Sequence, residues 1–284
     1  MEEVLHSADS ELRYFNRFVS GVWSDLRVSP PVAWRLFLRS LQASYRQSWL
    51  GYFWLLVPPL ATTATWVYLH SANILNVGQT SLPYPAYVLT GSLLWQVFAE
   101  ALNSPLQQLS SARSILTKSR IPHEALLLAG LIEVLFNFAV RFLVLLPVFI
   151  WFKSHWNLTL PTASMLLAPF GVAALLLLGF AIGLLLTPVG LLYHDVARGL
   201  NLVAMFWFFL TPVIYPLPAT GSARSLLSLN PVTPLLDATR KWLTSGPASV
   251  PREFVFVVAL TIPTLLIAWL FERLARPHVV ARLG

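Results

Sequence analysis

Long uncharged stretches dominate the chain and are separated by short polar segments. One of them, from Leu50 to Ala99, contains no charged side chain. A helix that crosses a membrane needs about 20 mostly apolar residues. We therefore predict an all-α polytopic membrane protein with six transmembrane helices. The predicted spans are Tyr52–Leu75, Ala86–Leu109, Ala125–Phe152, Met165–Leu192, Leu200–Tyr215 and Phe254–Leu270.

The segment before the first span has the pattern of a helix lying on the membrane. At about 100° per residue its large apolar side chains share one face, and a polar stripe lies roughly a quarter turn away. Such a helix places arginines among lipid phosphates. We expect it at residues 32–50, because the pair Pro30-Pro31 suits a helix start. The apolar face holds Trp34, Phe37, Leu38, Leu41, Tyr45 and Trp49, and the stripe holds Arg35, Arg39, Gln42 and Arg46.

Three polar segments between the spans carry further signals. Ser110–Glu124 is basic, and is either a plain loop or a short helix that docks a cytoplasmic partner. Tyr193–Gly199 is predicted to be a tight turn. Pro216–Pro251 is too polar to cross, and we predict two short helices broken at Asn230-Pro231. Short helices of this kind are re-entrant or lie on the surface, where protein or water covers their ends.

The basic side chains predict the orientation. With the N-terminus inside, thirteen Lys and Arg residues fall on the cytoplasmic side, five fall outside, and Arg141 lies within a span. Cytoplasmic loops carry the excess of Lys and Arg. We therefore expect cytoplasmic segments at residues 1–31 and 272–284 around a transmembrane domain at residues 51–271.

The composition agrees with a membrane protein and excludes several kinds of chemistry. Of 284 residues, 56% are apolar and 11% are charged, about half the charge of a typical soluble protein. The net charge is +7, but the basic residues flank apolar spans, as expected of a membrane protein. The charge therefore does not indicate a nucleic-acid-binding protein. The chain has no cysteine, GxxxxGKS/T loop, metal-ligand histidine spacing or Ser/His/Asp set. We expect no enzyme activity and no cofactor or metal bound by this chain.

Charged and small residues inside the spans form two further signals. Glu133 and Arg141 are eight residues apart, about 80° around a helix, and bracket a polar strip. Intramembrane charges pair with one another or face water, so we expect pairing between helices, with substrate contact as the alternative. Glu100 either joins them or is solvated near the cytoplasmic end. Gly179-x-x-x-Gly183 indicates close helix packing.

Aromatic residues on the first and fifth spans are candidates for a path through the membrane. Aromatic faces can stack against sugar rings while allowing the chain to slide, as they do for bases. The alternative is that these rings contact lipid or pack in the core. The candidates are Trp54, Trp66, Tyr68, Phe206, Trp207 and Phe209.

Four segments together resemble a known family. They are Tyr45–Trp54 with Pro58, Lys118–Pro122, Leu210–Pro216 and Asn230–Pro234. In order and spacing they are similar to the permease subunit of ABC-2-type polysaccharide exporters, which secrete O-antigen, capsule or teichoic acid. One departure is Tyr193-His194-Asp195, where the family typically has Arg-Asp at the second and third positions.

The resemblance implies an assembly and a substrate. The permease would be a homodimer in a bacterial inner membrane, with two copies of a separate subunit that binds ATP and magnesium. Ser110–Pro122 would be the coupling helix, with Arg113, Lys118, Arg120 and Pro122 facing the ATPase, and Ser222–Ser245 would form the extracytoplasmic gate. The substrate would be a polysaccharide on undecaprenyl diphosphate. Arg35, Arg39 and Arg46 would bind either that diphosphate or membrane lipid head groups.

Two other functions remain open at this stage. An ABC-2 permease for a drug, peptide or lipid would share the fold and differ in substrate. A membrane scaffold without transport would share only the helices.

Overall fold

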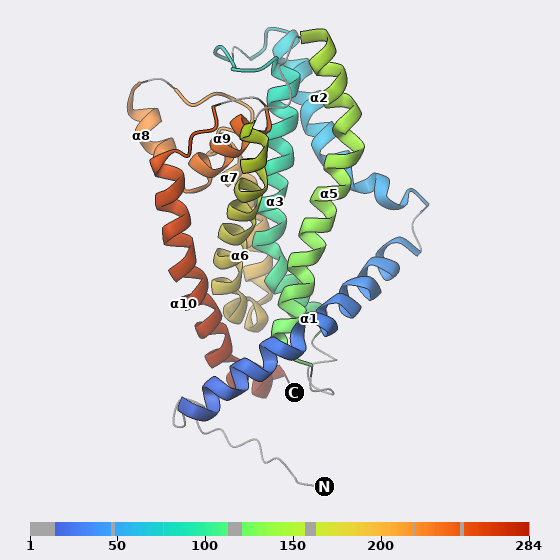
Figure 1. Cartoon of the computed structure of the whole chain (residues 1–284), viewed down its shortest axis with the longest axis vertical. Helices are drawn as coiled ribbons and strands as arrows, with labels where there is room; N and C mark the ends of the chain where they lie inside the picture. Colours follow the sequence, from blue (N-terminus) through green and yellow to red (C-terminus); the bar gives the residue numbers. More distant parts are fainter. Residues whose placement is uncertain are drawn as a thin grey trace.

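The computed structural model describes residues 15–46, 49–75, 77–112, 121–156, 163–218, 220–244 and 247–283. All regular secondary structure in these ranges is helical (Figure 1), as the sequence predicts. The helices are α1 (Phe15–Arg46), η2 (Gly51–Leu55), α2 (Val57–Ser71), α3 (Tyr84–Ser111), α5 (His123–Trp156), η3 (Ala163–Leu167), α6 (Ala168–Leu192), α7 (His194–Phe209), α8 (Ser222–Leu229), α9 (Val232–Leu243) and α10 (Arg252–Leu283).

Three helices among the described residues are long and apolar enough to cross a membrane. They occupy His123–Val148, Ala163–Leu192 and Arg252–Arg276 and correspond to the third, fourth and sixth predicted spans. α2 and α7 have 15 and 16 residues, fewer than the ~20 that a full crossing needs. α3 has 28 residues, but polar side chains such as Gln96 and Glu100 interrupt its apolar sequence. The count of six spans remains a prediction.

α3 is the central helix of the fold. It packs against α2, α5, α6, α7 and α9, and Figure 1 shows it running between α5 and α6. Its side chains Val88, Phe98 and Leu102 are fully buried in the main hydrophobic cluster. Helices from distant parts of the sequence therefore use one helix as their common packing surface.

Glycines bring α6 against the backbone of α3. Gly179 faces the Phe98 carbonyl and Gly183 faces the Leu102 carbonyl, so closely that a Cβ at either position would collide with the oxygen. Small residues allow helix backbones to approach in this way. The close packing predicted from Gly179-x-x-x-Gly183 is confirmed.

The proline pair lies within α1 instead of starting a helix. α1 runs from Phe15 through Pro30 and Pro31 to Arg46, so the expected start at residue 32 is wrong. Proline in a helix interior removes one hydrogen bond and crowds the preceding turn. The Ser29 hydroxyl donates to the Asp25 carbonyl at 2.6 Å just before the pair. Packing of α1 on α5, through the buried Phe37, offsets much of the cost.

α7 differs from the predicted fifth span at both ends. It begins at His194, so the expected turn over Tyr193–Gly199 is wrong and Tyr193 alone separates α6 from α7. Asp195 in the first turn favours a helix start, because a carboxylate is stabilised at a helix N-terminus. α7 ends at Phe209, shortly before Pro212, because a residue that precedes proline avoids helical geometry.

The two short helices after α7 are present where the sequence predicts them. α8 and α9 flank the break at Asn230-Pro231, so that prediction is confirmed. Both helices lie at one end of the molecule, whereas α1 and the C-terminal end of α10 lie at the other (Figure 1). The long helices α3, α5, α6 and α10 connect the two ends.

We predict that Gly183→Ala destabilises the protein. The added methyl group would meet the Leu102 carbonyl of α3, and forcing extra atoms into a packed interior costs about 1–3 kcal/mol. Gly199→Ala is the matched control, because a Cβ on this glycine of α7 would have nothing within 4 Å and alanine favours a helix. Thermal unfolding of the purified protein in detergent measures both. A melting temperature for Gly183→Ala at or above that of the parent would contradict the contact.

Candidate functional site

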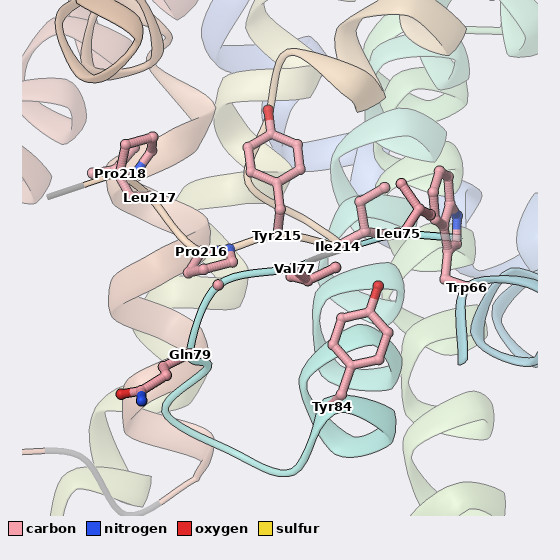
Figure 2. Close-up of a pocket in the computed structure, with 11 residues that line it drawn as sticks. Trp66, Leu75, Val77, Gln79, Tyr84, Ile214, Tyr215, Pro216, Leu217 and Pro218 are labelled. Carbon is pink, nitrogen blue, oxygen red and sulfur yellow. The ribbon is translucent and has the colours of Figure 1, made fainter. Parts of the chain in front are cut away.

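An aromatic pocket of about 500 Å³ opens at the end of the molecule that carries α8 and α9. The rings of Trp66, Tyr84 and Tyr215 line it, together with residues 77–79 and 216–218. Figure 2 shows Trp66 and the 216–218 segment on opposite sides, with the two tyrosines between them. Aromatic faces with a few polar atoms at their edges suit a ligand that has both apolar and hydroxyl surfaces.

Arg240 of α9 holds one wall of the aromatic pocket in place. Its guanidinium donates to the carbonyls of Pro212 and Val213 at 3.0 and 2.8 Å and stacks on the Tyr87 ring at 3.8 Å. The Tyr87 hydroxyl donates to the Tyr215 carbonyl at 3.0 Å. Arg240 is only 1% exposed, and this burial lowers its pKa from the usual range. The carbonyls and the ring replace part of the water around the charge, whereas Nε and Nη1 have no hydrogen-bond partner in the described part of the chain.

Asn230, at the break between α8 and α9, completes this support. Its amide donates to the Leu210 carbonyl at 3.1 Å and to the Thr211 hydroxyl at 2.9 Å. Its Oδ1 accepts from the Trp207 indole at 2.9 Å and from the Val232 backbone at 3.0 Å. We call Arg240, Asn230, Tyr87 and Trp207 the loop clamp, because they bind the segment that follows α7.

The loop clamp was missed from the sequence. The sequence indicates Arg240 as a charge outside the membrane and Asn230 as part of a helix break and of a family-like segment, both within the predicted gate, and it does not indicate their contacts with the segment after α7. A signal was present: Arg240 follows Leu236 by four residues, so it lies on the apolar face of α9. An arginine on an apolar face needs buried acceptors.

The predicted aromatic candidates divide into exposed and packed rings. Trp54, Tyr68, Phe206 and Phe209 are exposed. Trp66 is half-buried and meets Phe209 with ring centroids 6.3 Å apart, so α2 and α7 share an aromatic surface. Trp207 is also half-buried and packs on Phe98. Trp207 therefore packs in the core and belongs to the loop clamp, in addition to its predicted place on a path through the membrane.

The predicted basic sites are only partly described. Arg35 and Arg39 are exposed on α1, next to the exposed Trp34. The side chain of Arg46, and all of Arg113, Lys118 and Arg120, lie outside the described residues. Pro122 is half-buried directly before α5. The roles predicted for these residues stay predictions.

The carboxylates of Glu100 and Glu133 line a second, polar pocket of about 360 Å³ between α3 and α5. Glu100 forms an ion pair with Arg141 and accepts from Asn137 at 3.2 Å. Arg141 also donates to the Leu55 carbonyl of η2 at 2.9 Å. Glu133 instead accepts from the Gln108 amide at 2.8 Å. The predicted pairing of charges between helices is thus present: Glu100 of α3 pairs with Arg141 of α5.

An ion network ties α1, α5 and α10 together at the opposite end from α8. Arg273 donates to Glu124 at 2.9 Å and to Asp25 at 3.0 Å. Arg276 donates to Glu124 at 2.7 Å and to Glu272 at 2.8 Å. Glu124, Glu272 and Arg273 are at most 7% exposed. In the sequence these arginines indicated only the orientation, and their carboxylate partners were missed. The network consists of Asp25, His123, Glu124, Glu272, Arg273 and Arg276.

Comparison with known families identifies the architecture. A model of the ABC-2 type transporter family matches residues 32–244, three-quarters of the chain. The chain belongs to the ABC-2 type transporter family. The matched region of this ABC-2 transporter runs from α1 to α9, and includes both pockets and the loop clamp. The resemblance seen in the sequence is thereby confirmed.

The ABC-2 transporter is also similar to curated proteins with named roles. It is 30% identical over 72% of its length to "O-antigen export system permease protein RfbA" of Myxococcus xanthus, covering 76% of that protein. It is 21% identical to a protein of the same name from Klebsiella pneumoniae, over 78% of this chain and 83% of that one. It is 20% identical to "Polysialic acid transport protein KpsM" of Escherichia coli, over 82% and 88%.

We predict that Arg240→Gln loosens the segment after α7. The change removes a charged donor from the buried carbonyls of Pro212 and Val213, and hydrogen bonds to charged groups contribute about 1.5–3 kcal/mol. Hydrogen exchange over residues 210–218 should increase, and the melting temperature should fall. Lys241→Gln is the control, because Lys241 is half-exposed and pairs with Asp237 at the surface. Equal exchange in the two variants would contradict the clamp.

We predict that Arg273→Ala strongly destabilises the protein. The change removes the buried cation that pairs with Glu124 and Asp25. Breaking a buried ion pair costs about 3–5 kcal/mol. Denaturation of the purified protein in detergent measures the change. Arg198→Ala is the control, because its ion pair with Asp195 is almost fully exposed and contributes little. If both variants unfold at the same midpoint, the network does not support this end of the fold.

Proposed function

We propose that this ABC-2 transporter is the membrane-spanning subunit of an ATP-driven exporter of a lipid-linked cell-surface polysaccharide. The observation that carries the proposal is the similarity, over 72% and 82% of the chain, to permeases named for O-antigen and polysialic acid export. Because these are different polysaccharides, the shared fold suits glycans as a class. An ABC-2 permease for a drug, peptide or lipid is the second candidate, and no contact in the described residues favours it.

The proposed topology has six spans with both termini in the cytoplasm. α5, α6 and α10 are long and apolar enough to cross the membrane. α2, α3 and α7 would form the other three spans, and η2 and the adjoining loop residues would add the length that the short helices lack. The arrangement of α1 and the end of α10 at one end of the molecule, opposite α8 and α9, supports this topology (Figure 1). α8 and α9 would then form the extracytoplasmic gate.

The proposed energy source is a separate ATP-binding subunit, because this sequence lacks a phosphate-binding GxxxxGKS/T loop. Two copies of each subunit would assemble. The basic segment that contains Arg113, Lys118 and Arg120 would dock the ATPase. It leads through Pro122 into His123 and Glu124, which belong to the ion network. Motion received there would pass directly to α1 and α10.

The proposed path for the glycan follows α2 and α7. Their exposed rings Tyr68, Phe206 and Phe209 would face a second copy of the chain, because large exposed apolar surfaces mark contact sites. Arg35, Arg39 and Arg46 on α1 would receive the diphosphate of the lipid carrier at the cytoplasmic surface, since arginine binds phosphate in a bidentate manner. The aromatic pocket beside the loop clamp would lie near the exit.

Deletion of the gene tests the proposal. We expect loss of the surface polysaccharide, its accumulation inside the cell, and recovery when the gene is restored, because this subunit would form the route across the membrane. Gel analysis of surface glycan, with total glycan as control, measures the result. Unchanged surface glycan together with altered efflux of a drug or peptide would favour the second candidate. Failure to co-purify with an ATP-binding subunit would favour a scaffold.

A further inference from the structure

The polar pocket between α3 and α5 is unusual for the interior of a membrane protein. Most of its lining is polar, and includes Gln96, Asn103 and Gln107 of α3, Asn137 of α5 and Asn201 of α7. Polar side chains inside spans are expensive and commonly mark the path of a substrate. Its volume of about 360 Å³ lies within the range of small-ligand sites, about 300–1,000 Å³.

The amides of this pocket leave acceptors for a ligand. The Nδ2 atoms of Asn103, Asn137 and Asn201 donate to the Ala99 carbonyl, Glu100 and the Ala197 carbonyl, at 2.9, 3.2 and 3.1 Å. These bonds fix the orientation of the amides and leave the Oδ1 atoms available. Each Oδ1 has two lone pairs that can accept from a hydroxyl group.

Two buried polar atoms on the same pocket have no partner in the described part of the chain. They are Oγ of Ser104, a residue that is 6% exposed, and Oε1 of Gln96. Buried polar atoms are almost always hydrogen-bonded. These two residues are eight positions apart on α3, about 12 Å along the helix, so two separate hydroxyl groups would be needed, one donating to Gln96 and one accepting from Ser104. A ligand that carries several hydroxyls matches this requirement.

The charge of the pocket separates neutral from acidic ligands. Its described lining contains the carboxylates of Glu100 and Glu133 and no basic side chain. Arg141, which is not one of the lining residues, forms an ion pair with Glu100 and neutralises its charge. Glu133 instead accepts from the uncharged side chains of Gln108 and Ser40. An anionic sugar would therefore meet a net negative surface, and like charges at short range repel.

We propose that this polar pocket binds an uncharged, hydroxyl-rich stretch of glycan during transport and rejects acidic glycan. The inference rests on the proposed export function and adds to it a binding site and a charge preference. Amide and hydroxyl groups would hold the sugar, and Glu133 would exclude carboxylated residues. Because the hydrogen bonds come from α3, α5 and α7, the bound sugar would contact all three helices.

The absence of cysteine from the chain provides a direct test. Ala99→Cys places one thiol on the pocket wall, and Ala248→Cys places one on an exposed loop as the control. Alkylation by N-ethylmaleimide is measured on the purified protein in lipid nanodiscs. The probes are neutral gluco-, manno- and galacto-oligosaccharides and a sialic acid oligomer of similar length. We expect at least one neutral probe, at about ten times its dissociation constant, to slow alkylation at Ala99→Cys about tenfold, with no effect at Ala248→Cys.

The charge preference is tested by Glu133→Gln in the Ala99→Cys background. Neutral protection should remain, which also shows that the variant is folded, and the sialic acid oligomer should gain protection of about tenfold. Three results would overturn the proposal: no protection by any neutral probe, equal protection by the acidic oligomer in the parent, or no gain in Glu133→Gln.

Export in cells separates this inference from the proposed function. In the deletion strain, Gln107→Leu combined with Asn137→Leu should lower surface glycan severalfold at an unchanged protein level. Thr264→Leu, at a half-buried position of α10 outside the pocket, is the control and should restore export fully. Full export by the double variant would contradict glycan binding in the polar pocket, but it would not contradict the proposed export function. Unchanged glycan on deletion would overturn the function, while the alkylation assay would still report on the pocket.

Discussion

The approach of α6 to the backbone of α3 is the contact on which the remaining structure depends. Gly179 and Gly183 allow it, because any side chain there would collide with carbonyls of α3. With α6 this close, α3 becomes the middle helix and presents its other faces to α2, α5, α7 and α9. Side chains on those faces contribute to two other features: Tyr87 belongs to the loop clamp, and Glu100 lines the polar pocket.

Polar groups in this fold occur at three levels, and each level joins a different set of helices. The loop clamp joins α3, α7 and α9 at one end. Glu100 and Arg141 join α3 and α5 in the middle. The ion network joins α1, α5 and α10 at the other end. Since hydrogen bonds and ion pairs have defined geometry, they fix the register of helices whose apolar surfaces alone would allow sliding.

Features that depend on local sequence could be predicted from the sequence, and features that depend on distant partners could not. The break at Asn230-Pro231 and the packing glycines of α6 follow from backbone chemistry, and both are present. The continuation of α1 through Pro30 could not be foreseen, because packing on α5 outweighs the local preference. Glu124 was missed because its partner Arg273 is far away in the sequence, whereas Arg240 carried a local signal in its place on the apolar face of α9.

The ion network has a consequence for the order in which the protein is made. Glu124 precedes its partners Arg273 and Arg276 by 149 and 152 residues, and Asp25 precedes Arg273 by 248. While the ribosome is still synthesising the middle of the chain, these carboxylates have no arginine of α10 to meet and stay in contact with water. This end of the bundle can therefore close only after α10 has been inserted. A nascent chain stopped before α10 therefore lacks the arginine partners of Glu124 and Asp25.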